Sequence, residues 1–523
     1  MDKIHGLIKY TRVMKKFTFT FAFLIVLLTI VSFINSNSEI DGYEDQYSVV
    51  FDSKIPVDPA GGYTSTPQQM AEFAWKEFAA LNWPAAPSTV PNSSGFKRGT
   101  PDTSEKLGAT GSGGTVVWET FAHRVELYPG RKSYTMPIPD LPAIEDAPTN
   151  YEYGLSATVV APVGVDTTLF NNLDEASEIT LADMYYTPMV APNTVEASLL
   201  YEAKANNVIY NYVRDEKYQN SLERSEAAAN TVKKINNQPF TTPVFELPDG
   251  SIEMKATWRR YNEGVDNLAD FHHTNAIWYS GKTMGTLMVQ NDIFLLIGLH
   301  IIHKTPSFQT FTFATFEHVS NEKNGFQFVN THDGVDSTTI PGRSIPEAGV
   351  ITAIRQFPIP DGSNGSFNLV AFNQQMQKQL QSQFGTNIVW ANYELIGIQG
   401  QVANNPTADV PPQTFFLSNF ATETNNTLQF FQGGLSGTFS NIVDPNKATV
   451  FKLKDKSQTV YESFTAGGCV ACHGAQGQVG GYDFSVISAT GNSFSPEPPE
   501  DYPAGTVVNQ DPTGYPIPKK SDH

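Results

Sequence analysis

The chain has 523 residues and a formal net charge of -19 at pH 7, a length that supports two domains or one large domain with additions. Its content of 40% hydrophobic and 12% aromatic residues is typical of a folded protein and excludes a mainly disordered chain. Because phosphate backbones are bound through lysine and arginine, a surface this negative also argues against nucleic acid as a partner.

Residues 1–38 differ in charge from the rest of the chain. They hold five basic residues and one acid, a net +4, so the remainder carries -23. Lys15 and Lys16 precede an apolar run from Phe17 to Ile34, a pattern typical of an export signal and close to the shortest membrane span. We therefore expect a signal peptide or an N-terminal anchor, and a periplasmic or extracellular protein. Contact with a membrane is expected only through an anchor that is not cleaved.

Helical spacing of apolar residues predicts three helical regions. The first lies within "STPQQMAEFAWKEFAALNWP", which starts at Ser65 with a Ser/Thr cap and is closed by Pro84. The second extends from about Thr194 to Ala229, contains no glycine or proline, and is expected to hold two helices. The third is "LVAFNQQMQKQLQSQF", from Leu369 to Phe384. Residues 85–115, rich in Pro, Ser, Gly and Thr, are expected to form a long loop.

Segments rich in β-branched and aromatic residues predict strands, most of them in the second half of the chain. They are residues 115–127, 251–261, 273–280, 293–305, 308–319 and 388–401. Several follow one another with turn residues between them, which favours antiparallel pairing. We expect an α+β fold, a large domain with an antiparallel β-sheet and flanking helices.

The two cysteines of the chain stand three residues apart in "GGCVACHG". Cys469, Cys472 and His473 form C-x-x-C-H, the attachment pattern of c-type haem. On a helical turn residues i and i+3 share a face, so both sulfurs can bond to one porphyrin while the histidine ligates the iron. A thioredoxin-type site normally opens a helix of a βαβ unit, which is not evident here, and zinc needs four ligands. We therefore predict one covalent haem c.

This motif completes the expected domain organisation. Residues 1–38 are the signal peptide or anchor, residues 39–440 the large α+β domain, residues 441–490 the haem-c attachment region, and residues 491–523 a proline-rich tail. Export agrees with the motif, because haem is attached to c-type apoproteins outside the cytoplasm.

The second axial ligand of the iron is expected upstream of the motif, because the last methionine of the chain is Met376. The segment "GLHIIHKTPSFQTFTFATFEHVSN" reads as a hairpin joined at residues 305–309. Alternation then places His300 on one face and His303 on the other. His300 and His318 are the leading candidates for the distal ligand. The alternative for each is a structural role, as a hydrogen-bonded histidine on the sheet. Lys304 is expected to be a solvated turn residue, with an amine ligand of the iron or a distal proton donor as the alternatives.

Segments from residue 65 to residue 490 resemble a group of large exported bacterial proteins of the cytochrome c family, most of them uncharacterised. The residues that carry the resemblance are "FAWKEFAALNWP", "VWETF", "IEMKATWR", "GLHIIHKT", "ATFEHVSN", "VWANYELIGIQ" and "GGCVACHG". The resemblance implies haem binding and electron transfer. It maps the thioether positions onto Cys469 and Cys472 and the proximal ligand onto His473.

Three hypotheses for the function follow. The first is an exported c-type cytochrome that passes single electrons to a redox partner protein. The second is a haem-dependent oxidoreductase, peroxidase-like or P460-like, in which an open distal iron site activates a small substrate; the missing downstream methionine motivates it. The third makes the large domain a binding module for a polysaccharide or protein, which exposed tryptophans would favour. The substrate, the redox potential and the oligomeric state leave no signal in the sequence.

Overall fold

The structure is a computed structural model that describes residues 47–131, 135–154, 158–178, 182–186, 198–235, 237–281, 286–321, 326–330, 350–353, 359–362, 365–400, 419, 421–422 and 495–499. The chain divides into two units, Met1–Ser48 and Val49–His523, and the fold below is that of the second. Within the described residues no helix has both the length and the apolar character needed to cross a membrane. The run from Phe17 to Ile34 lies outside these residues.

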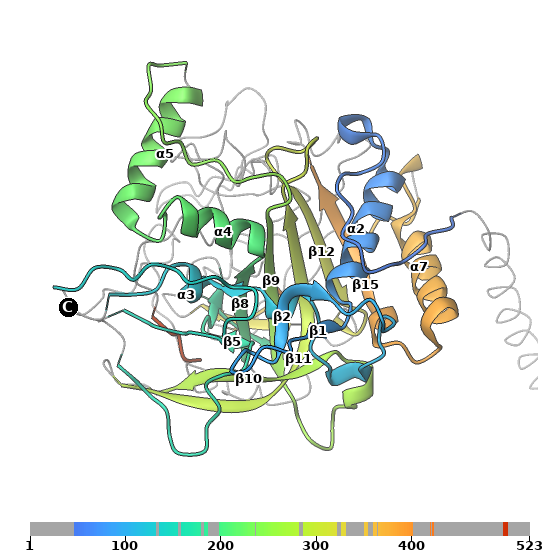
Figure 1. The fold of residues 1–523 in the computed structure, drawn as a ribbon. Helices are drawn as coiled ribbons and strands as arrows, with labels where there is room; N and C mark the ends of the chain where they lie inside the picture. The colour runs from blue at the N-terminus through green and yellow to red at the C-terminus, as the bar shows by residue number, and fades with distance from the viewer. Residues whose placement is uncertain are drawn as a thin grey trace, which may run out of the picture. The chain divides into compact units, whose positions relative to one another are not determined.

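The fold is α+β, and a nine-stranded, mainly antiparallel sheet forms its centre (Figure 1). Its main path runs β15 (Tyr393–Gln399), β12 (Thr312–His318), β11 (Leu287–His303), β9 (Ile252–Arg260), β8 (Leu199–Ala205) and β3 (Ala122–His123). The first half of the long strand β11 also pairs with β10 (His273–Ser280) and β4 (Val159–Val160), and β10 pairs with β5 (Asn172–Leu173). The expected antiparallel sheet is confirmed.

Two smaller sheets complete the strands of the described chain. One has the order β14 (Val350–Ala353), β13 (Phe326–Asn330), β7 (Ala182–Tyr186) and β6 (Ser177–Glu178). The other pairs β1 (Ala85–Pro87) with β2 (Phe96–Pro101), within the segment that we expected to be a loop throughout.

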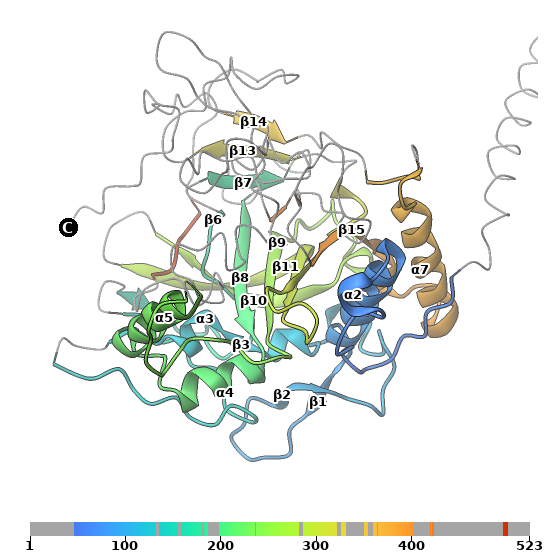
Figure 2. The same cartoon turned by 90° about the horizontal axis from the view of Figure 1, so that it is seen from above.

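Two helices cover one face of the large sheet, α2 (Pro67–Leu81) and α7 (Leu369–Phe384), side by side next to β15 in Figures 1 and 2. Helix α2 begins where the sequence predicts, because Thr66 and Gln69 form a reciprocal capping box ahead of it. Phe78 of α2 stacks on Phe316 of β12 with ring centroids 4.2 Å apart. The Trp75 indole donates to Asn373 of α7 at 3.1 Å. This face carries the aromatic core.

The opposite face is covered at one end of its strands by α3 (Arg124–Leu127), α4 (Asn207–Asp215) and α5 (Ser221–Ile235). Ala203 and Ala205 of β8, Ile302 of β11 and Phe313 of β12 form one buried apolar cluster with side chains of these helices. The helices cover only one end of these strands, the end at which the apolar residues of the cluster lie.

Besides the loop expected over residues 85–115, the sequence prediction was wrong in two segments. Residues 115–127 form the 3-10 turn η3 (Trp118–Thr120), the two-residue strand β3 and the one-turn helix α3, because the Glu119 carboxylate accepts the Val116 N–H at 2.8 Å and folds the chain back. The predicted helical region begins with a strand, β8, and only then forms α4 and α5. All seven residues of β8 are buried between neighbouring strands, and Asn206 caps α4 directly after it.

Candidate functional site

A polar patch occupies the part of the second sheet face that the helices leave uncovered. Directly paired residues of neighbouring strands point to the same face, and the pairing aligns Lys255 with His300, and His300 with Thr315. The next row aligns Tyr201, Thr257, Gly298 and Glu317. We call the side chains of Tyr201, Lys255, Thr257, His300, Thr315 and Glu317 the polar face. Each of them is buried, His300 with 7% and Lys255 with 8% of its surface exposed.

The hairpin geometry predicted for this region is confirmed. Strands β11 and β12 pair antiparallel, and His303 lies on the face opposite His300. There its Nδ1 contacts the carboxylate of Glu77 on α2, and its ring stacks on Phe73. The expectation for Lys304 was wrong, because this residue has only 5% of its surface exposed.

A short stretch upstream of the cysteine motif, residues 419 and 421–422, lies against the polar face. The Asn419 amide donates to the Thr315 hydroxyl at 2.9 Å and to the Phe316 carbonyl at 3.0 Å. The hydroxyls of Thr257 and Thr422 lie 2.8 Å apart. Gly298 permits this approach, since a Cβ there would lie 3.1 Å from atoms of Asn419, Ala421 and Thr422. A residue larger than glycine would therefore crowd these three side chains.

A second stretch, after the cysteine region, is held at the β8 edge of the sheet. The Glu497 N–H donates to the Asp174 carbonyl at 2.9 Å, and its carboxylate accepts the Ala176 N–H at 3.4 Å. Asp174 is the centre of a charged cluster, since Arg124 lies 3.1 Å and His123 3.3 Å from one of its carboxylate oxygens. Burial alone would raise the pKa of Asp174, but Arg124 and His123 lower it to about 2.

The charged cluster connects to the polar face. Arg124 also pairs with Glu175 at 2.7 Å, and Glu175 lies 3.6 Å from the ammonium group of Lys255. The Tyr153 hydroxyl donates a hydrogen bond to Asp174 at 2.9 Å and accepts one from the Tyr279 hydroxyl at 3.1 Å. Glu175 therefore links Lys255 of the polar face to the charged cluster around Asp174.

A further buried ionic group lies on the aromatic face and was missed by the sequence reasoning. Lys204 donates to the Phe170 carbonyl at 2.8 Å and to the Asn171 side chain at 3.1 Å, and lies 3.6 Å from Glu202. Glu119 lies 3.2 Å from His272. Burial would raise the pKa of Glu119, but His272 and Lys204 lower it on balance, whereas burial raises the pKa of Glu202. The charged residues inside the apolar segments "VWETF" and "LLYEAKA" were the signal in the sequence that could have indicated this buried ionic group.

The two candidates for a distal iron ligand, His300 and His318, lie on opposite faces of the sheet. His318 stacks on Phe271 with ring centroids 4.0 Å apart. Its Nε2 lies 3.0 Å from the Asp270 carbonyl, and its Nδ1 accepts the Ser320 N–H at 3.2 Å. Burial lowers the pKa of His318 to about 4. Both ring nitrogens of His318 therefore have protein partners, and only His300 lies on the polar face.

Cys469, Cys472 and His473 lie outside the described residues, as do the boundaries expected at residues 38, 440 and 490. Within the described part of the chain no cluster of three His, Cys, Asp or Glu side chains could hold a metal ion. All six tryptophans are described and none has more than 7% of its surface exposed. The exposed tryptophan platform that the binding-module hypothesis requires is absent from these residues.

Comparisons with protein-family models, with curated proteins and with solved structures find no match to this chain.

Proposed function

We propose that this protein is an exported c-type cytochrome that carries one haem and transfers electrons to a redox partner protein. Cys469 and Cys472 would hold the haem through thioether bonds, and His473 would bind its iron. When bound, the haem supplies reversible one-electron chemistry, and its potential depends on the axial ligands and on burial. The observation that carries the proposal is the C-x-x-C-H motif, which contains the two cysteines of the chain.

The arrangement of the described residues supports docking of the haem segment near the polar face. The motif lies between Thr422, which contacts Thr257, and Glu497, which contacts Asp174. Both contacts are to the large sheet or its edge, and the motif lies between the two contacting residues in the sequence. The polar face fits a haem in its donor set, because it offers an imidazole at His300.

His300 is the proposed distal ligand. It lies on the face that Asn419 and Thr422 contact, whereas His318 lies on the opposite face of the sheet. Two nitrogen ligands, His473 and His300, would give a six-coordinate iron suited to electron transfer.

Covalent attachment is tested by expressing the chain with and without cytochrome c maturation machinery. We expect the secreted protein to gain the mass of one haem only with the machinery, and the Cys469→Ser/Cys472→Ser variant to gain none. Val470→Ala, which keeps both cysteines and the histidine, is the matched control and should attach haem normally. A bare polypeptide mass for the wild type, when a known cytochrome c matures in the same host, would disprove the proposal.

The second candidate function is a haem-dependent oxidoreductase with an open distal site. It is favoured by the absence of a methionine after His473, because small cytochrome c domains take their sixth ligand from there. A high-spin ferric spectrum that shifts on addition of cyanide, together with turnover of peroxide or hydroxylamine, would establish it over electron transfer. A low-spin spectrum unaffected by cyanide would support the first function.

A further inference from the structure

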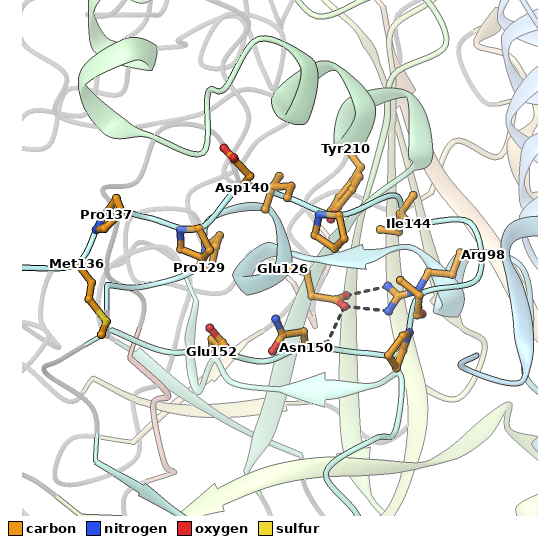
Figure 3. Close-up of a pocket in the computed structure, with 15 residues that line it drawn as sticks. Arg98, Glu126, Pro129, Met136, Pro137, Asp140, Ile144, Asn150, Glu152 and Tyr210 are labelled. Carbon is orange, nitrogen blue, oxygen red and sulfur yellow. Dashed lines mark hydrogen bonds and ion pairs between the residues drawn. The ribbon is translucent and has the colours of Figure 1, made fainter. Parts of the chain in front are cut away.

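A cavity of about 420 Å³ lies between α4, β2 and the chain from Pro129 to Glu152 (Figure 3). This volume is within the range of small-molecule sites, roughly 300 to 1,000 Å³. The cavity is lined by described residues only, all of them between Arg98 and Tyr210 in the sequence, and the inference below does not depend on the proposed function.

One wall of the cavity is a rigid ion pair without net charge. The Arg98 guanidinium donates to both carboxylate oxygens of Glu126 at 2.9 Å, as the dashed lines in Figure 3 show. Glu126 also accepts the backbone N–H groups of His123 and Asn150, and Arg98 donates to the Ala147 carbonyl. Burial would raise the pKa of Glu126, but Arg98 lowers it overall, so the pair stays ionised. It therefore attracts neither anions nor cations strongly.

Tyr210 of α4 contributes a hydroxyl to the cavity. Only 2% of its surface is exposed, and no described residue forms a hydrogen bond with its hydroxyl. Burial and the nearby Glu126 carboxylate raise the pKa of Tyr210 above its usual range. The hydroxyl is therefore protonated at neutral pH and is a hydrogen-bond donor available to a ligand.

The remaining lining is largely apolar and rich in rings. Five prolines line the cavity, Pro129, Pro137, Pro139, Pro142 and Pro148, with aliphatic side chains such as Ile144 between them. Asp140 and Glu152 are the other acids of the lining and disfavour an anionic ligand. Sugars and proline-rich peptides dock on aromatic platforms, and Tyr210 is the sole aromatic residue of this lining.

We propose that this cavity binds an uncharged aromatic compound with a hydrogen-bond-accepting oxygen, a ligand of the phenol class. Its ring packs against the proline rings and Ile144, which removes apolar surface from water. Its oxygen accepts the hydrogen bond of the Tyr210 hydroxyl, and its lack of charge matches the neutral Arg98–Glu126 wall.

The probe for the experiment is 2-naphthol, titrated into the full-length protein by calorimetry. We expect saturable binding at one site. Tyr210→Phe should weaken binding about tenfold, the worth of a buried hydrogen bond, and Ala147→Phe, which fills the cavity, should abolish it. Tyr63→Phe, a change at a tyrosine with 51% of its surface exposed, is the matched control and should leave binding unchanged.

The anion 2-naphthoate should bind at least tenfold more weakly than 2-naphthol. Circular dichroism melting curves check that each variant is folded before its titration is interpreted. Absence of saturable 2-naphthol binding to the folded wild type, or equal affinities of the Tyr210→Phe variant and the wild type, would overturn the proposal. So would equal binding of 2-naphthoate.

Discussion

Lys255 and His300 lie directly opposite each other on β9 and β11, and both are buried. A buried sheet face is normally apolar, and a charged residue on it needs a partner. Lys255 has such a partner in Glu175 at the sheet edge. The polar face is therefore a buried set of polar side chains with its own charge partner, and it differs in this from the apolar core of the opposite face.

Replacement of the two histidine candidates should separate their roles. If His300 is the distal ligand, His300→Ala converts the low-spin haem spectrum of the wild type to a high-spin one that responds to cyanide. His318→Ala should leave the spectrum low-spin, because His318 lies on the other face and is bound by Asp270 and Ser320. Absorption spectra of both oxidation states provide the measurement. A spectral change in His318→Ala alone would reverse the assignment.

Gly298→Ala should destabilise the protein through overpacking. The new Cβ would lie 3.1 Å from Ala421, Asn419 and Thr422, and overpacking of this kind costs about 1 to 3 kcal/mol. Urea unfolding gives the change in the free energy of unfolding. Combination with Thr422→Val should be less than additive, because both changes weaken the same contact. Strict additivity would show that Thr422 does not lie on Gly298 in solution.

The sheet was predictable because the local sequence of each main strand has a clear strand pattern. Strand β9 follows the expected segment within one residue at each end, and helix α7 has the expected bounds, since β-branched runs and helical periodicity were both strong there. The prediction failed for residues 115–127, where the carboxylate of Glu119 bonds the backbone of Val116 and replaces a strand by a turn. Strand propensity takes no account of a side chain that forms a hydrogen bond with the nearby backbone and so competes with strand pairing.

The candidate site was predictable only in part. Alternation along the hairpin placed His300 and His303 on opposite faces, because the period of a strand is fixed by its geometry. It did not show that Lys204 would meet Glu119, Phe170 and Asn171, which are distant in sequence. Such a cluster depends on tertiary packing. A single sequence marks it only by charges inside otherwise apolar segments.

His318 should make stability depend on pH in the weakly acidic range. Its pKa is lowered from 6.5 to about 4 in the folded protein, so between these values the unfolded chain binds a proton that the folded chain does not. Stability therefore falls as the pH falls from 6.5 to 4, by on the order of 3 kcal/mol for this residue.

The test compares wild type with His318→Gln by urea unfolding at pH 7, 6, 5 and 4. The loss of stability on acidification should be smaller in the variant, because glutamine does not titrate. Other groups titrate in both proteins and cancel in the difference. Parallel curves for the two proteins would contradict a neutral, buried His318.

Removal of the buried ammonium group at Lys204 should be among the most costly single changes in the core. Lys204→Met leaves Glu202, the Glu119 and Phe170 carbonyls and Asn171 without their common partner. Breaking a buried pair from one side costs about 3 to 5 kcal/mol. Lys234→Met, which breaks an ion pair with Glu246 that is 42% exposed on both sides, is the control and should cost less than about 1 kcal/mol. Urea unfolding measures both, and equal effects would show that Lys204 is hydrated rather than bound within the sheet.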